Sequence, residues 1–226
     1  SFYRGSVIRG GNHGFLRHFV FDPPETTERA LVYRVPVSRI PPDAYPLKVS
    51  LELSYALSDD GLRVEFLFTN EESDLDAHVS FGLHPGFAVS SVSDCKVLFP
   101  EGTYLRYYAP GNFLDGREEE IRFGGGEMPF DKAKLADSYL IGLEAVPSRV
   151  LVLEDANHGR RITFDFSEVP FLTLWTDTET YICVEPCWGL PDSNPPRPFE
   201  EKIGIQAISP GASLRRGFAI KPGFLP

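Results

Sequence analysis

Apolar residues at every second position, in short segments that end at turn residues, are the feature that most restricts how this chain can fold. Between residues 49 and 68 they alternate with polar residues on both sides of the turn Ser58-Asp-Asp-Gly61, and residues 149–166 repeat the pattern around a second turn. Such alternation predicts strands with one buried face, joined as hairpins. A sustained helical period occurs nowhere in the sequence. We therefore predict an all-β fold.

The length of the chain and its turn residues extend this prediction to the whole sequence. The 226 residues include 20 glycines and 20 prolines, which are spread along the chain like punctuation between short strands. All-β sandwiches of roughly 200–250 residues are commonly single domains. We predict one large antiparallel β-sandwich domain over residues 1–226. It should close with a terminal hairpin that pairs 205–208 with 217–221.

Charge and hydropathy argue against two classes of partner. The formal net charge is −10 and the lysines and arginines form no dense run, so nucleic acid and an anionic membrane surface are unsuitable partners. Apolar runs stay well short of the ~20 residues of a membrane span, and no signal peptide is visible. We expect a cytoplasmic protein with a small-molecule ligand. The sequence does not fix the oligomeric state, and a homodimer is compatible with it.

The three cysteines are Cys95, Cys183 and Cys187, an odd number without a Cys-x-x-Cys pair. We interpret them as reduced thiols of a cytoplasmic protein. Cys183 and Cys187 straddle Glu185, so a metal site is conceivable there. Free cysteines are more often small buried apolar residues, however. We therefore predict core positions rather than metal ligands.

A candidate catalytic histidine follows a predicted strand. Val79, Phe81 and Leu83 alternate with small residues and lead to His84, where Pro85-Gly86 ends the strand. A histidine held between a strand and a turn has a fixed direction, and its unperturbed pKa lies near neutrality. A strand-end histidine is more often structural than catalytic, so a catalytic role requires a partner.

Glu185 is the candidate partner. It follows the apolar run Ile182-Cys-Val184, which predicts a buried strand. A carboxylate at the end of such a strand, at the aromatic-lined entrance of a site, has a raised pKa unless it is hydrogen-bonded. A general base is tuned toward neutrality in this way. An ion pair with a nearby arginine explains this segment equally well. Trp175 and Trp188 lie at strand ends close to these polar groups and could stack on a sugar ring, although core packing is the commoner role of a tryptophan.

A second histidine, His13, lies in the glycine-rich stretch Gly10-Gly-Asn-His-Gly14. Glycines leave the backbone around it free of side-chain bulk, so a tight turn that ligands can approach is predicted. A solvated loop residue is the alternative.

Several motifs, taken in order, make the chain resemble the aldose 1-epimerase (galactose mutarotase) superfamily, in particular a branch often described as LacX-like. They are His13-Gly-Phe-Leu-Arg17, Phe81-Gly-Leu-His84-Pro-Gly-Phe87, Phe171-Leu-Thr-Leu-Trp175 and Val184-Glu-Pro-Cys-Trp-Gly189, followed by Asp192-Ser193 and Glu201-Lys-Ile-Gly204. The match covers nearly the whole chain, and the order of the motifs is more specific than any one of them.

The resemblance implies a β-supersandwich with a sugar cleft on one face, and it implies roles for single residues. Glu185 matches the family's general base and His84 its general acid. His13 matches a histidine that hydrogen-bonds the substrate. Asp137 is placed like an aspartate that binds a sugar hydroxyl, and Arg17 matches the arginine of the branch's His-Gly-Phe-Ala-Arg stretch.

The activity so implied is interconversion of the α and β anomers of a free aldohexose by acid–base ring opening, without a metal or an organic cofactor. Two alternatives stay open: a non-catalytic carbohydrate-binding protein, and a hexose-6-phosphate 1-epimerase with a phosphate pocket built from Arg17 and either Arg4 or Arg9. Family members usually carry several dozen more residues at the N-terminus, including an arginine that reaches the sugar. In this chain that arginine is either absent or replaced by Arg4 or Arg9.

Overall fold

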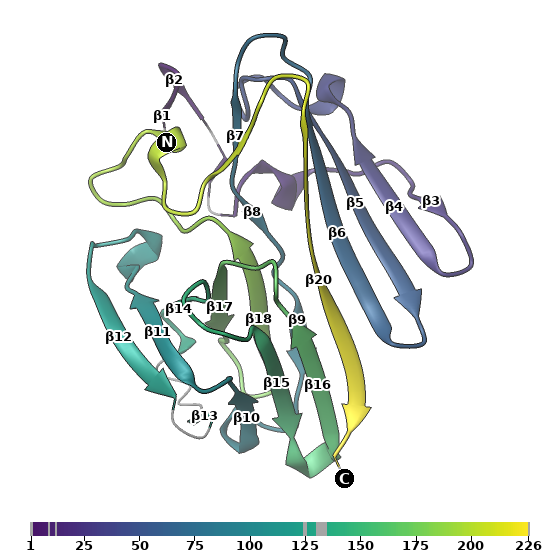
Figure 1. Cartoon of the computed structure of the whole chain (residues 1–226), viewed down its shortest axis with the longest axis vertical. Coiled ribbons are helices and arrows are strands. Elements are labelled where there is room, and N and C mark those ends of the chain that lie inside the picture. Colours follow the sequence, from purple (N-terminus) through teal and green to yellow (C-terminus); the bar gives the residue numbers. More distant parts are fainter. Residues whose placement is uncertain (1, 9, 12, 124–125, 130–134, 226) are drawn as a thin grey trace.

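The computed structural model describes the chain except for residues 1, 9, 12, 124–125, 130–134 and 226, and it confirms the all-β prediction (Figure 1). Two large antiparallel sheets hold most of the strands. Short 3-10 segments of three or four residues lie between the strands: η1 (Phe15–His18), η2 (Val37–Arg39), η3 (Val92–Asp94), η4 (Pro110–Asn112), η5 (Ala156–His158) and η6 (Phe199–Glu201). Within the part of the chain described, no helix is long and apolar enough to span a membrane.

The first sheet has nine strands in the order β13-β10-β15-β16-β20-β6-β5-β4-β3. In that order they are Glu127–Pro129, Cys95–Leu98, Val150–Asp155, Arg160–Asp165, Ser213–Phe224, Gly61–Asn70, Val49–Ser58, Ala30–Val35 and Glu25–Thr26. The pairs β5–β6 and β15–β16 are the two hairpins that the alternation predicts.

The second sheet has seven strands, in the order β12-β11-β14-β17-β18-β8 with β9 also paired to β18. They are Glu118–Phe123, Gly102–Tyr107, Tyr139–Gly142, Phe171–Trp175, Tyr181–Trp188, Phe81–Gly82 and, for β9, Gly86–Ala88. Two small sheets pair β1 (Phe2–Tyr3) with β2 (Ser6–Val7) and β7 (Ala77–Val79) with β19 (Gln206–Ile208).

The predicted terminal hairpin is wrong. Gln206–Ile208 pairs with β7, whereas β20 runs between β6 and β16 in the nine-stranded sheet. Alternation indicates which face of a strand is buried, but it carries no information on which strand lies alongside. The partners of β19 and β20 are more than 40 residues away, so a local pattern could not identify them.

The core lies between the two large sheets. Phe66 of the first sheet makes an edge-on contact with Trp188 of the second, with ring centroids 5.8 Å apart. Phe81 stacks on the same indole at 5.0 Å. Trp188 is fully buried, and its ring N–H donates to the Glu168 carbonyl at 2.9 Å, so its polar atom is satisfied inside the core.

Candidate active site

The candidate catalytic residues lie opposite each other on neighbouring strands. β8 and β9 are two short segments at the edge of the second sheet, and both pair with β18. The register joins Gly82 to Cys187 and Gly86 to Cys183. Three residues separate the paired positions on each side, so the register continues through the gap. His84, in the middle of one side, therefore lies opposite Glu185, in the middle of the other.

Alternation along β18 sets the direction in which Glu185 points. Ile182 and Val184 face the core, so Cys183 and Glu185 point to the outer face of the second sheet. On the edge strand Leu83 packs against the core and His84 is exposed on the outer face. Both candidate side chains thus lie on the same face of the sheet, away from the main core.

The two side chains lie close together but differ in their exposure to solvent. Glu185 Oε1 is 3.2 Å from His84 Nε2, and the glutamate side chain is 9% exposed while the histidine side chain is 39% exposed. This contact lacks hydrogen-bond geometry, and Oε1 is buried without a hydrogen-bond partner among the described residues. A buried carboxylate oxygen without a partner is costly, so it is expected to have a function.

Burial shifts both pKa values away from the charged forms. It raises the pKa of Glu185 to about 8. Burial lowers the pKa of His84, and the positive charge of Arg17 lowers it further, against a hydrogen bond to its own backbone that raises it. Near neutral pH the pair therefore retains one proton between its two members.

Two further aromatic rings frame His84. The His13 ring meets it edge-on with centroids 5.2 Å apart, and the Trp175 ring does so at 5.6 Å. His13 lies in the predicted turn with a left-handed backbone (φ 65°), an uncommon conformation for a residue other than glycine. Burial lowers the pKa of His13, as do the charges of His84 and Arg17. Arg17 itself is exposed on η1.

Two predicted site residues remain, Asp137 and Trp188, and they lie in different surroundings. Asp137 is exposed two residues before β14, whose first residue, Tyr139, pairs with Leu174; Asp137 thus lies at the end of the sheet where Trp175 lies. Trp188 presents no ring surface to solvent because it fills the core, and we leave it out of the sugar site. Its position three residues after Glu185 already indicates the opposite face of the strand.

Of the two arginines considered as replacements, Arg4 donates to the Asp76 carbonyl at 3.0 Å and lies against the Tyr3 ring. Arg9 lies outside the described residues. Among the described residues Arg17 is the arginine whose charge acts on both His13 and His84.

Cys183 belongs to the site although its sequence context predicts only a core residue. Its thiol, a His84 ring nitrogen and a Glu185 carboxylate oxygen all lie within 4.8 Å of one another. The spacing of two residues between Cys183 and Glu185 places them on the same face of one strand. That spacing is the signal by which the sequence could have identified it.

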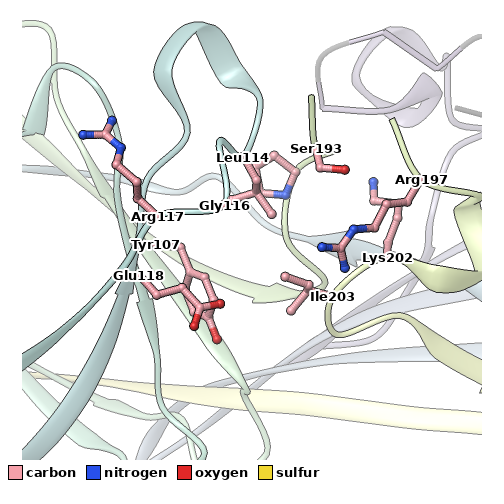
Figure 2. A pocket seen from close by; sticks show the side chains of 10 residues that line it. Tyr107, Leu114, Gly116, Arg117, Glu118, Ser193, Arg197, Lys202 and Ile203 are labelled. Atoms are coloured by element: carbon pink, nitrogen blue, oxygen red, sulfur yellow. The ribbon is translucent and has the colours of Figure 1, made fainter. Parts of the chain in front are cut away.

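A separate cavity of about 100 Å³ lies on the outer face of the same sheet (Figure 2). Figure 2 shows Tyr107 and Glu118 on one side and Arg197 and Lys202 on the other. The register runs from Tyr107 through Leu140 and Thr173 to Glu185, three strands away, or roughly 14 Å at about 4.8 Å per strand. This cavity contains neither member of the His84–Glu185 pair.

Comparisons with known proteins show which family the chain as a whole resembles. The family model described as aldose 1-epimerase matches residues 9–221. The plasmid-encoded protein LacX of Lactococcus lactis subsp. lactis is 26% identical over 239 residues, which cover 97% of this chain and 76% of that protein.

Two solved structures share the fold. A galactose mutarotase related enzyme from Lactobacillus acidophilus superposes with a TM-score of 0.88 at 22% identity, over 98% of this chain and 77% of that one. A galactose mutarotase-like protein from Lactobacillus casei ATCC 334 gives 0.83 at 25% identity, over 99% and 82% of the two chains.

Proposed function

This chain belongs to the aldose 1-epimerase family, and on that premise we propose that it interconverts the α and β anomers of a free aldohexose. The observation that carries the proposal is the 3.2 Å approach of Glu185 Oε1 and His84 Nε2 on one sheet face. Anomer exchange requires one group that accepts the proton of the anomeric hydroxyl and one that donates a proton to the ring oxygen, and both oxygens are bonded to the same hemiacetal carbon.

In the proposed reaction Glu185, ionised, takes the proton from the anomeric hydroxyl while His84, protonated, donates to the ring oxygen. The bond between the anomeric carbon and the ring oxygen breaks and yields the open-chain aldehyde. Rotation about the C1–C2 bond then presents the other face of the carbonyl. Ring closure returns the proton from Glu185 to the new anomeric hydroxyl and the other proton to His84.

The perturbed pKa values suit this exchange. The pair retains one proton near neutrality, and the reactive arrangement is the one in which His84 holds that proton and Glu185 is ionised. His13 and Trp175 adjoin the His84 ring and would contact the sugar. We assign His13 and Arg17 to hydroxyl binding, Trp175 to the apolar face of the ring, and Asp137 to a hydroxyl at the end of the sheet.

Polarimetry of freshly dissolved α-D-glucose and α-D-galactose tests the proposal. The full chain should accelerate mutarotation, and Glu185→Gln and His84→Ala should each reduce the rate by on the order of 10²–10⁴-fold. The matched controls are Glu120→Gln and His18→Ala, which replace exposed residues outside the site and should keep the wild-type rate. A site variant that retains the wild-type rate would remove that residue from the mechanism.

Polarimetry also separates the enzyme from a carbohydrate-binding protein. Absence of acceleration by the wild-type chain, together with a sugar-dependent change in Trp175 fluorescence, would establish binding without catalysis.

A hexose 6-phosphate is the second candidate substrate, and one observation favours it. Arg17 is exposed, its charge acts on both histidines of the site, and it has no carboxylate partner among the described residues. A free guanidinium is a good ligand for a phosphate group. Polarimetry with α-D-glucose 6-phosphate decides between the substrates, because a preference that Arg17→Ala abolishes would identify the phosphorylated sugar.

A further inference from the structure

Three side chains of the candidate site carry ligand atoms close enough to share one metal ion. Ligand atoms of His84, Cys183 and Glu185 all lie within 4.8 Å of one another, and the nitrogen and oxygen of the first and last are 3.2 Å apart. Zn²⁺ binds imidazole nitrogen, thiolate sulfur and carboxylate oxygen at about 2.0–2.3 Å. Ligand atoms that share this ion are thus roughly 3–4 Å apart, a spacing that small side-chain movements reach here.

The local backbone explains why these three atoms converge. Cys183 and Glu185 project from the same face of β18, and His84 projects toward them from the position opposite Glu185. Cys183 is itself buried, and the residue opposite it is Gly86, which adds no side chain beside the thiol. A Cβ atom at Gly86 would lie 3.8 Å from the Cys183 sulfur.

A second, independent observation concerns the buried carboxylate of Glu185. Glu185 is 7% exposed, and its Oε1 atom accepts no hydrogen bond from the described residues. A bound cation would satisfy this oxygen, because its positive charge would compensate the carboxylate for the water that burial excludes. The half-exposed ring of His84 leaves one side of the group open to solvent.

We propose that Zn²⁺ binds to His84, Cys183 and Glu185 and thereby switches off the acid–base pair. Imidazole, thiolate and carboxylate are each ligand types that zinc uses, and three protein ligands leave a fourth position for water. Binding releases the thiol proton and the proton held by the pair. The bound ion then occupies the lone pairs of both His84 and Glu185, so neither can transfer a proton to a sugar.

The regulatory consequence rests on the proposed function, whereas metal binding does not. Zinc and sugar should compete, because the anomeric hydroxyl and ring oxygen of the sugar use the same two side chains as the ion. The ion is thus an inhibitor of this site and takes no part in the reaction.

Co²⁺ titration of the full chain, purified in chelator and then transferred to chelator-free buffer, tests the site directly. One equivalent of Co²⁺ should produce the near-ultraviolet charge-transfer absorption of a thiolate–cobalt bond. Added Zn²⁺ should displace the Co²⁺ and remove this absorption. Cys183→Ser should abolish this absorption. The matched control Cys187→Ser removes a thiol on the other side of Glu185 that is outside the three-residue group and should keep the absorption.

Zinc affinity gives the second readout. Cys183→Ser should weaken Zn²⁺ binding by on the order of 100-fold, since even outer-shell partners of a metal contribute about 10- to 100-fold. If that variant does not fold, His84→Ala at the half-exposed position should show a comparable loss. Zinc binding that is unchanged in both variants, or absent in the wild type, would overturn the proposal.

Measuring absorption and mutarotation separately keeps the two proposals distinguishable. Co²⁺ absorption without sugar turnover would leave the metal site standing and remove the epimerase assignment. Sugar turnover that Zn²⁺ does not inhibit, in a protein without the Co²⁺ absorption, would leave the epimerase assignment standing and remove the metal site.

Discussion

A Cβ atom at Gly82 would lie 2.7 Å from the carbonyl oxygen of Pro186. This close approach is where β8 joins β18, two residues before His84 on one strand and one residue after Glu185 on the other. Any side chain at Gly82 would push the edge strand away from β18, and the histidine would move with it.

Gly82→Ala should therefore reduce activity and stability together. We expect a destabilisation of about 1–3 kcal/mol from overpacking and a clear fall in kcat, both measured on the same preparation. Gly86→Ala is the matched control on the other side of His84. Its Cβ would have only ordinary contacts, 3.4 Å to the Tyr181 ring and 3.8 Å to the Cys183 sulfur, so stability should change little. Equal effects of the two substitutions would contradict this account.

The pH dependence of the rate should be bell-shaped when measured in chelator. Below the lowered pKa of His84, which is under 6.5, both groups are protonated and no base remains. Above the raised pKa of Glu185, about 8, the pair has lost its last proton and no acid remains. Activity should peak between these limits and fall on both sides. A rate that stays constant from pH 7 to 10 would refute the shared-proton model.

Arg17 should set the position of the acidic limb. Its positive charge lowers the pKa of His84, so Arg17→Ala should raise that pKa and move the acidic limb of the profile to higher pH. Arg17→Lys keeps the charge and should leave the limb in place. An acidic limb that does not move in Arg17→Ala would show that His84 is not the group that titrates there. The basic limb, which depends on the burial of Glu185, serves as the internal control.

Glu185→Gln should stabilise the fold increasingly as the pH rises. The wild-type carboxyl titrates at about 8 when folded and near 4.5 when unfolded. Between these values the unfolded chain loses its proton first, so wild-type stability falls as the pH rises through this window and stays low above it. Glutamine does not titrate, and its advantage should grow by up to a few kcal/mol between pH 4.5 and 8. Denaturant unfolding at several pH values measures this, with Glu120→Gln as the exposed control; parallel curves for Glu185→Gln and wild type would count against a raised pKa.

The two tryptophans should respond differently to sugar. Trp175 is half-buried beside His84, whereas Trp188 is enclosed in the core. Trp175→Phe should abolish a sugar-dependent fluorescence change and raise KM. Trp188→Ala should leave a cavity and cost about 3–5 kcal/mol of stability, while the milder Trp188→Phe should retain the sugar response. A sugar response that persists in Trp175→Phe would place the ligand elsewhere.

The sequence predicts local elements well and their partners poorly. The alternation in β5 and β6 indicates both the strands and their turn, because neighbouring strands joined by a short turn pair with each other. β20 shows the same alternation, yet its partners are β6 and β16. Pairing over long separations depends on how complete sheets pack, and local periodicity does not encode it.

The candidate site shows the same division. Residue type and local context identify His84 and Glu185 as candidates, but their opposition depends on β8 and β9 pairing with β18 about a hundred residues later. The roles of His13 and Arg17 come from family resemblance, and their proximity to His84 from the structure. Successive residues of a strand point to opposite faces of the sheet. This rule alone, applied to β18, would have placed Trp188 on the face opposite Glu185 and Cys183 on the same face as Glu185.

The two catalytic candidates differ in how firmly the sheet holds them. Glu185 lies on β18, which has a neighbouring strand on each side, whereas His84 lies between two short segments at the sheet's margin. Segments at a margin open locally at lower free energy than interior strands. The histidine can therefore be displaced, or replaced over evolutionary time, without unravelling the strand that carries the glutamate. In a lineage that acquired a different reaction on this scaffold, the position of His84 would be the less costly place to begin.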